Sequence, residues 1–212
     1  MDTIISEFEG WTIRIRPGSG TRILVLLHGW TGDENSMSIF IRNIQPDYWI
    51  ILPRAPHKAI SSGYSWRELS SSGGWPTIEA FQPSAMKIIN MIEHFSEANH
   101  LQSSTIDMAG FSQGGAMTFT VSTYFPDRIR KAGILAGFAP VGADGLLTSE
   151  TFAKKHFFIA HGTRDATVPI EMAKRTKLLL ENSGAIVTYC ESEIGHKLSS
   201  DGLRSFVEYL AN

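Results

Sequence analysis

Several features that mark other classes of protein are scarce in this sequence of 212 residues. It has one cysteine, Cys190, which excludes an internal disulfide framework and suits a reducing compartment. Its 21 acidic and 19 basic residues nearly cancel, so no extended basic surface is available for nucleic acid. No apolar stretch approaches the ~20 residues of a membrane span, and Asp2 and Glu7 stand where a signal peptide would be basic. We therefore expect a cytoplasmic protein that binds no nucleic acid and makes no stable membrane insertion.

The hydrophobic residues, 42% of the chain, follow an alternation of strand and helix patterns. Continuous apolar runs, typical of strands buried on both faces of a parallel sheet, occupy 23–27, 49–52, 106–109, 132–136 and 157–160. Helical periodicity covers 85–95, 116–125, 169–183 and 203–210, with a last strand at 185–191. Alternation at 4–8 and 11–16 predicts an antiparallel pair at the sheet edge. Residues 1–212 are thus predicted to form a single α/β domain with a mostly parallel sheet, helices on both faces and no large cap domain.

The pentapeptide at 110–114 reads Gly-Phe-Ser-Gln-Gly and lies between a predicted strand and a predicted helix. A serine hydroxyl is a weak nucleophile, so enzymes that use one hold Oγ on a tight strand-to-helix turn beside a base and backbone N–H donors. A glycine on each side of Ser112, two residues away, permits such a turn. We interpret the segment as a nucleophile elbow with Ser112 as the nucleophile.

Two other polar residues follow predicted strands and are candidate partners of Ser112. Ligands of open α/β sheets bind beyond the carboxyl ends of the strands, so catalytic side chains are expected there. Asp165 comes after the strand at 157–160 and is predicted to be the orienting acid. His196 comes after the strand at 185–191 and is predicted to be the base. The chain order Ser, Asp, His is that of α/β-hydrolases, and it differs from the order in chymotrypsin-like and subtilisin-like enzymes.

An acyl-transfer site also needs two backbone donors for the negative charge that develops on the carbonyl oxygen. Gln113, the residue after the proposed nucleophile, would supply the first N–H. The segment 28–32 reads His-Gly-Trp-Thr-Gly and follows the strand at 23–27, where its glycines let the backbone approach the site. The Trp30 N–H is therefore the predicted second donor, with its side chain free to face substrate.

Other acids and histidines leave alternative assignments open. Glu191 and Glu193 are close to His196 in sequence and could orient it in place of Asp165. The histidines His28 and His161 also follow or end strands, and with His196 they could form a three-histidine zinc site, although no tight ligand pair is present. The pattern favours the hydrolase assignment, without metal or cofactor. Surface or turn positions are predicted for the remaining acids considered, which are Asp107, Asp127 and Asp144.

The segment 54–81 shows no clear periodicity and is predicted to be a long active-site loop. Its aromatic residues include Trp66 and Trp75, which we expect to line a substrate cleft together with Val168; the alternative is that the aromatics only pack the loop onto the sheet. Two glycines near Trp75 raise the further expectation that 70–76 acts as a flap over the site.

These motifs together resemble the phospholipase/carboxylesterase group of α/β-hydrolases, which includes acyl-protein thioesterases and small bacterial carboxylesterases. The resemblance spans almost the whole chain and is carried by the motifs at 27–29, 52–56, 65–66, 110–115, 161–169 and 195–196. It implies an α/β-hydrolase fold, a triad of Ser112, Asp165 and His196, and oxyanion donors at Gln113 and Trp30. Trp-Thr at 30–31 departs from the Leu-Gly or Tyr-Gly often found in relatives, at a position whose side chain is expected to face substrate.

We therefore expect a serine hydrolase that cleaves carboxylic esters, thioesters or lysophospholipids through an acyl-enzyme. Its partner would be a small-molecule ester or acyl substrate, and a homo-oligomer is compatible with the sequence. The absence of a cap domain and of a basic amphipathic helix favours a carboxylesterase. Two alternatives stay open: an acyltransferase that uses the same acyl-enzyme, and a catalytically silent binding protein on a hydrolase fold.

Overall fold

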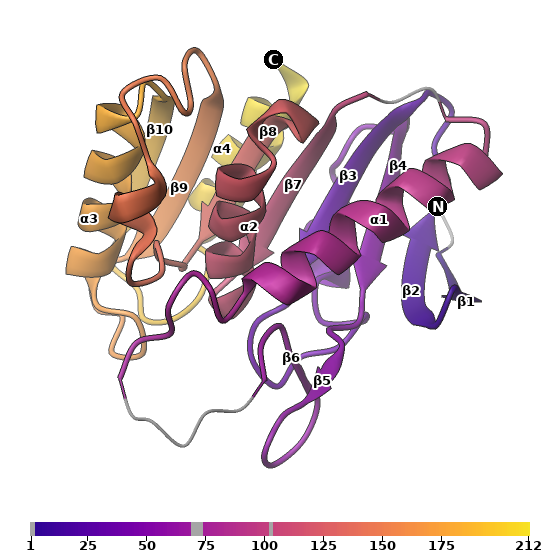
Figure 1. The fold of residues 1–212 in the computed structure, drawn as a ribbon, viewed down its shortest axis with the longest axis horizontal. Helices are drawn as coiled ribbons and strands as arrows, with labels where there is room; N and C mark the ends of the chain where they lie inside the picture. Colours follow the sequence, from indigo (N-terminus) through magenta and orange to yellow (C-terminus); the bar gives the residue numbers. More distant parts are fainter. Residues whose placement is uncertain (1–2, 69–73, 102–103) are drawn as a thin grey trace.

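A central eight-stranded sheet organises the chain in the computed structural model, which describes residues 3–68, 74–101 and 104–212 (Figure 1). The strands are β1 (Ile4–Phe8), β2 (Trp11–Arg16), β3 (Arg22–Leu27), β4 (Tyr48–Pro53), β7 (Ile106–Phe111), β8 (Ile129–Leu135), β9 (His156–Gly162) and β10 (Ile186–Ser192). Their order across the sheet is β1-β2-β4-β3-β7-β8-β9-β10. All neighbours from β4 to β10 run parallel, and β2 joins β1 and β4 antiparallel, so the predicted α/β fold with a mostly parallel sheet is confirmed.

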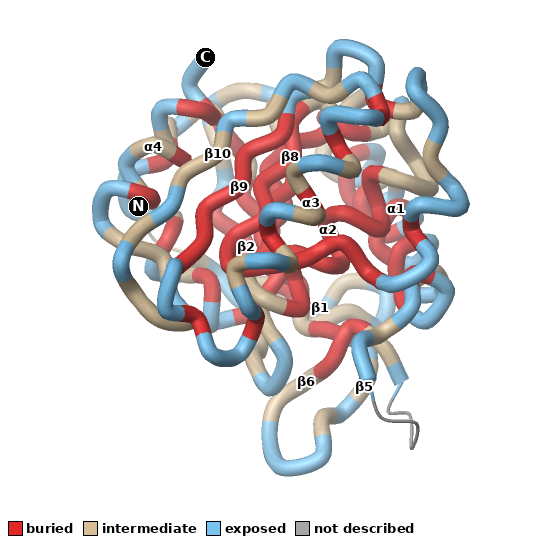
Figure 2. Tube along the Cα trace, turned by 90° about the vertical axis from the view of Figure 1, so that its left-hand side faces the viewer, coloured by how far each residue is buried: buried red, intermediate tan, exposed pale blue. Residues whose placement is uncertain are grey.

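The edge hairpin and the central strands follow from their sequences. Glu9 and Gly10 connect β1 to β2 with φ of +48° and +81°, the pair of positive values that a type I′ hairpin turn requires. In β3 every residue after Arg22 is buried, because helices cover both faces of the sheet there. Figure 2 shows the buried backbone concentrated in the central strands and in the helix that follows β7.

Helices cover the two faces of the sheet unequally. Three lie on the face toward the viewer in Figure 1, α1 (Gln82–Ala98), α2 (Gln113–Tyr124) and α3 (Ile170–Asn182), while α4 (Ser200–Ala211) lies behind. Short 3-10 helices add η1 (Ser38–Phe40), η2 (Pro126–Arg128) and η3 (Ala143–Leu146). Residues of α2 are buried on nearly all sides, whereas the amphipathic α4 turns one apolar side to the sheet. No helix in the described ranges is long and apolar enough to cross a membrane.

A small hairpin interrupts the segment 54–81, which the sequence predicts to be a loop. It pairs β5 (His57–Lys58) with β6 (Tyr64–Ser65), two strands too short to show a hydrophobic period. The hairpin is tied back to the main domain by a bridge between Gly32 and Tyr64. The expected flap at 70–76 lies largely outside the described residues, which resume at Gly74.

The prediction that Asp107 occupies a surface or turn position is wrong. Asp107 is only 2% exposed, and its carboxylate accepts hydrogen bonds from Arg130 and, at 2.5 Å, from the Tyr48 hydroxyl. Arg22 Nη2 lies 3.8 Å from the same carboxylate. Burial and the Asp107 charge raise the pKa of the Tyr48 phenol, which therefore stays a donor. A polar side chain in the middle of a strand is buried here because cations from neighbouring elements converge on it.

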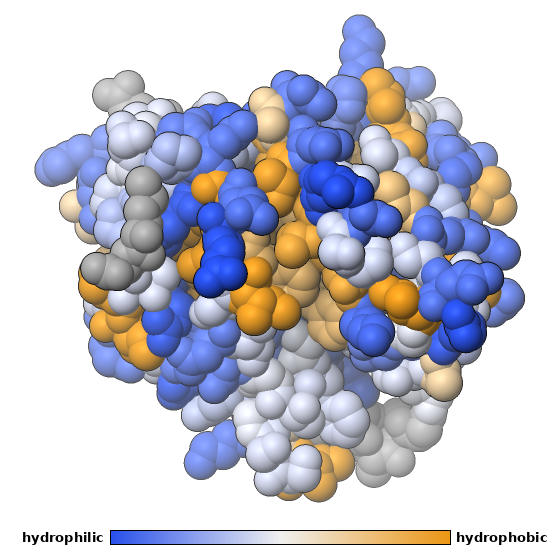
Figure 3. Space-filling view, turned by 180° about the vertical axis from the view of Figure 1, so that it is seen from behind, coloured by the Kyte–Doolittle hydropathy of each residue, from blue (hydrophilic) through white to orange (hydrophobic). Residues whose placement is uncertain are grey.

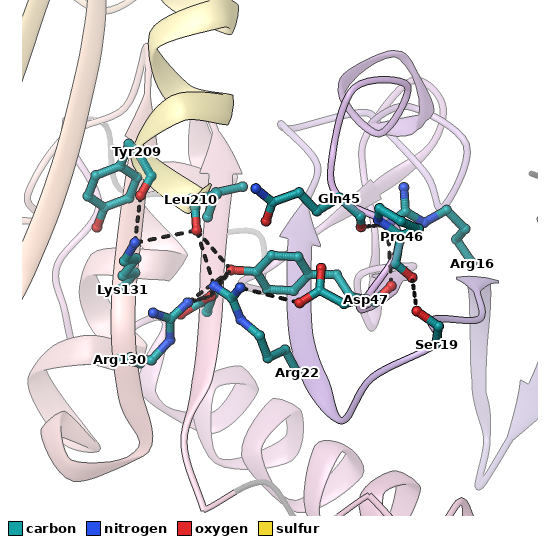
Figure 4. Close-up of polar contacts among 12 residues, drawn as sticks. Arg16, Ser19, Arg22, Gln45, Pro46, Asp47, Arg130, Lys131, Tyr209 and Leu210 are labelled. Carbon is teal, nitrogen blue, oxygen red and sulfur yellow. Dashed lines mark hydrogen bonds and ion pairs between the residues drawn. The ribbon is translucent and has the colours of Figure 1, made fainter. Parts of the chain in front are cut away.

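This cluster also anchors the C-terminal end of α4 (Figure 4). Lys131 Nζ donates to the Tyr209 carbonyl oxygen at 2.6 Å, and Arg22 Nη2 donates to that of Leu210 at 3.1 Å. The last carbonyls of a helix have no partner within the helix and carry partial negative charge, so cations stabilise them. The far end of α4 is thereby fixed to the amino-end edge of the sheet.

We expect Asp107→Ala to lower the free energy of unfolding by about 2 kcal/mol, because it leaves the arginines without their buried counter-ion; the loss is smaller than for a fully buried pair since both arginines retain water contact. Urea unfolding measures it. The matched control is Asp127→Ala at an exposed position, with an expected change within about 0.5 kcal/mol. Equal effects of the two substitutions would contradict the anchoring role of Asp107.

Candidate active site

Ser112 lies on the sharp turn between β7 and α2. Its φ of +54° and ψ of −116° are unusual for a residue with a side chain, a conformation that costs about 1–3 kcal/mol and that the surroundings must enforce. The Ser112 N–H donates to the Leu135 carbonyl oxygen at 2.8 Å. A Cβ at Gly110 would lie 2.0 Å from the Gly114 carbonyl oxygen, and one at Gly114 would lie 2.1 Å from that of Leu27. Both flanking glycines of the pentapeptide are therefore required by close backbone contacts.

The three residues that the sequence proposes as a triad come together in one hydrogen-bonded chain. His196 Nε2 lies 2.9 Å from Ser112 Oγ, and His196 Nδ1 lies 2.6 Å from Asp165 Oδ2. Asp165 and His196 occupy the loops after β9 and β10, so all three reach the carboxyl-end edge of the sheet from different strands. This arrangement allows His196 to accept the hydroxyl proton while Asp165 fixes the ring orientation.

Asp165 is held in its ionised form. Burial alone would raise the pKa of its carboxyl, but backbone N–H groups of Val168 and Thr167 and the His196 ring outweigh burial and lower it. Both N–H groups donate to Oδ1 at 2.9 Å. Oδ2 is left to accept from His196, which selects the tautomer with the proton on Nδ1 and a free lone pair on Nε2.

The alternative acids have other partners. Glu191 accepts a hydrogen bond from the Tyr189 hydroxyl at 2.8 Å, and the exposed Glu193 pairs with Arg164 at 3.1 Å. The Nδ1 atom that either would have to reach is already bonded to Asp165. Asp127 and Asp144 are exposed, as predicted.

The histidines proposed as an alternative metal site make structural hydrogen bonds. His28 Nε2 accepts from the Ala55 N–H at 3.0 Å, and its Nδ1 lies 2.7 Å from the Gly29 carbonyl oxygen, so both nitrogens are used. Burial lowers the pKa of His28, which favours the neutral ring that these bonds need. His161 Nε2 donates to the Val168 carbonyl oxygen at 2.8 Å. In the ranges that the structure describes, no three His, Cys, Asp or Glu side chains are grouped to hold a metal ion.

The two proposed backbone donors flank Ser112. A Cβ on Gly29 would lie 3.4 Å from the Ser112 Cβ, so the segment that carries Trp30 passes directly beside the nucleophile. Gln113 is the first residue of α2, where helix N–H groups have no partner within the helix. Among the described residues, the Trp30 and Gln113 N–H groups donate to no other protein group. Their role as oxyanion donors stays a prediction.

One segment, Tyr64 to Trp66, bonds to both donor-bearing loops. Tyr64 exchanges two backbone hydrogen bonds with residues 28–32, the proposed oxyanion loop, accepting from Thr31 at 3.0 Å and donating to Gly32 at 2.9 Å. Trp66 Nε1 donates to the His28 carbonyl oxygen at 2.7 Å, and the Trp66 backbone N–H donates to Gln113 Oε1 at 3.0 Å. The sequence assigns Gln113 only a backbone role; its side chain also bonds to Ser65 and Trp66, and Trp66 in turn bonds to His28. The only sequence signal for this side-chain role is the presence of a polar residue directly after Ser112.

The proposed substrate-contacting residues have different positions. Trp66 is fully buried at 0% exposure and Val168 is buried as well, so neither side chain has surface to offer a substrate, and this part of the prediction is corrected. Trp66 instead braces the oxyanion loop, and Val168 bonds to Asp165 through its backbone. Trp75 is 40% exposed and packs edge-on against Phe138, with ring centroids 4.8 Å apart. Its contact with substrate stays a prediction.

The chain is similar to known carboxylesterases. The phospholipase/carboxylesterase family model matches residues 13–212. A probable carboxylesterase of Oryza sativa subsp. japonica is 26% identical over 204 residues, which cover 88% of this chain and 75% of that protein. A SOBER1-like probable carboxylesterase of Arabidopsis thaliana is 25% identical over 217 residues, covering 93% and 81%.

A solved structure supports the fold separately. The Bacillus cereus carboxylesterase superposes with a TM-score of 0.85 at 19% identity, covering 96% of this chain and 94% of that one. With the family model extending over nearly the whole sequence, this chain belongs to the phospholipase/carboxylesterase family of α/β-hydrolases and is a hydrolase of the esterase and thioesterase type.

Proposed function

We propose that this hydrolase cleaves carboxylic esters or thioesters through an acyl-enzyme on Ser112, with His196 as base and Asp165 as its orienting acid. The observation that carries the proposal is the continuous chain of hydrogen bonds from Ser112 Oγ through both ring nitrogens of His196 to Asp165. The substrate would be a small-molecule ester or acyl compound, and the mechanism uses no cofactor.

In the first half of the reaction, His196 Nε2 takes the Ser112 proton as Oγ bonds to the carbonyl carbon. The tetrahedral intermediate collapses when the bond to the leaving oxygen or sulfur breaks, and that atom receives the proton from Nε2. In the second half, His196 takes a proton from water, whose oxygen attacks the acyl carbon. The bond to Oγ then breaks, Oγ regains the proton and the carboxylic acid leaves.

The Trp30 and Gln113 N–H groups would stabilise the oxyanion in both halves. Each such donor is worth about 3 kcal/mol in related sites, because it is fixed before the charge develops. In this protein, the hydrogen bonds of Tyr64 and Trp66 would hold the two donor N–H groups in place, because they connect the two loops that carry them.

Trp75 is the residue against which we propose that the acyl group of the substrate packs. A Cβ on Gly137 would lie 3.1 Å from the Ser112 carbonyl oxygen, so this segment passes beside the nucleophile. Phe138 follows it and carries the exposed Trp75 on its ring. An acyl group bound to Oγ on the face of the sheet that carries α1 to α3 would contact the aromatic rings of Trp75 and Phe138.

Ser112→Ala is expected to abolish hydrolysis of p-nitrophenyl esters while leaving the unfolding transition unchanged, because Oγ is the only atom removed. A fluorophosphonate probe should label the native protein at Ser112 alone, and peptide mass spectrometry locates the label. Labelling at another residue, or ester cleavage that survives the substitution, would remove Ser112 from the mechanism. A native protein that resists the probe would indicate a catalytically silent binding protein.

Asp165→Asn should lower kcat by about 10³–10⁴-fold, since an amide would favour the wrong tautomer of His196. Steady-state kinetics measure it, and circular dichroism checks that the fold is retained. Glu191→Gln and Glu193→Gln are the matched controls, and both are expected to keep kcat within about twofold because these acids bond elsewhere. A large loss in either control, with little loss in Asp165→Asn, would reassign the orienting acid.

His28 predicts a pH dependence of stability. Burial lowers its folded pKa below the ~6.5 of an exposed imidazole, so the unfolded chain binds the proton more tightly. The stability that the neutral His28 ring contributes is complete above a pH of about 6.5. It is lost as the pH falls below that value, by at most about 1.4 kcal/mol per pH unit. Urea unfolding at pH 7.5 and 5.0 should show a smaller acid loss in His28→Gln than in the native protein. Identical losses would mean that His28 is not held neutral.

A further inference from the structure

A cavity of about 560 Å³ adjoins the catalytic edge on the face of the sheet that carries α4 and η1. Its walls are largely apolar, and the side chains that the argument uses are Trp30, Ile39, Phe40, Phe111 and Leu203. Figure 3, which views this face, shows hydrophobic side chains gathered between hydrophilic clusters. Cavities of about 300–1,000 Å³ with mainly apolar walls are typical small-molecule sites. The proposed function does not use this cavity.

The cavity lies on the His196 side of the nucleophile. Phe111 directly precedes Ser112, and its ring centroid is 5.0 Å from that of His196. Lys197 and Leu198, the two residues after His196, belong to the cavity wall. The opposite wall begins at Gly29 and Trp30, so the oxyanion loop and the histidine loop enclose the cavity between them.

This position determines which part of a substrate can enter. In acyl transfer the oxyanion points to the backbone donors, and the leaving oxygen or sulfur must face the nitrogen that protonates it. The acyl group extends away from both. A cavity between the oxyanion loop and the His196 loop therefore adjoins the leaving group, whereas Trp75 and Phe138 lie on the other face of the sheet.

We propose that this cavity binds an apolar alcohol or thiol portion of the substrate, a conclusion that rests on the proposed function. The occupant is an alkyl or aryl chain attached to the leaving atom. Trp30, 51% exposed, offers an aromatic surface at the entrance, and Phe40 and Leu203 supply apolar walls further along. The exposed Lys197 and Ser200 form a polar rim. Substrate selection is thus expected to depend on the alcohol as well as on the acyl chain.

The test compares two series of esters. The first holds the acyl group as acetate and lengthens the alcohol from methanol to octanol; the second holds methanol and lengthens the acid from acetate to octanoate. Free acid release followed in a pH-stat gives kcat/KM. In the native protein, each methylene that enters the cavity should raise kcat/KM for the alcohol series by about fourfold at most, until the cavity is filled.

Two substitutions alter the cavity in different ways. Leu203→Trp fills it from α4, and Ile39→Asp places a charge on its wall at an exposed position that the fold tolerates. Each is expected to lower the ratio of octyl to methyl acetate kcat/KM at least tenfold and to leave the slope of the acyl series intact. The matched control is Leu178→Trp, at an exposed position on α3 across the sheet, and both slopes should stay native.

The readout is a ratio within one enzyme, so a general loss of activity does not mimic the effect. If Leu203→Trp does not fold, Ile39→Asp carries the same test. Retention of the alcohol slope in the folded variants would overturn the proposal, and so would loss of the acyl slope instead, which would place the acyl chain in this cavity. Failure of the proposed function has a different signature, because Ser112→Ala would then keep its activity toward both series.

Discussion

The contact between the first turn of α2 and the end of β3 is the constraint on which the rest of the site depends. Gly114 lies so close to the Leu27 carbonyl oxygen that no side chain fits between them. The same contact places Ser112 beside the loop that follows Leu27, which carries Trp30. The proposed nucleophile and the proposed second backbone donor are therefore positioned by one packing interaction between main chains, and the hydrogen bonds of Tyr64 and Trp66 hold the loop that carries Trp30.

The sheet separates two apolar regions near the proposed site. On the face of α1 to α3, Trp75 packs on Phe138, whose neighbour Gly137 lies beside Ser112, and on the face of α4 the cavity adjoins His196. The proposed catalytic residues lie at the sheet edge between these regions because each follows a parallel strand at its carboxyl end. In the proposed mechanism, the two parts of an ester would bind on opposite sides of this edge, against loops of the core fold.

The sequence carries the fold and the positions of the proposed triad because both depend on local order along the chain. Ser112, Asp165 and His196 each follow an apolar strand, and parallel strands bring such positions to one edge. What depends on tertiary contact is hidden. Asp107 looks like any strand residue until Arg130 and Tyr48 are seen around it, and Trp66 looks like a binding aromatic although it is fully buried. The η1 and α4 walls of the cavity lie about 160 residues apart in sequence, so no local sequence motif predicts the cavity.

The cations that hold the last turn of α4 have a consequence for the opposite end of that helix. Ser199 caps its first turn only three residues after His196, so α4 connects the cluster around Asp107 to the loop that carries His196. Detachment of this one helix would displace His196 while most of the sheet stays folded. Inactivation by heat or denaturant is therefore expected to begin as a local event at α4, at a lower free-energy cost than global unfolding.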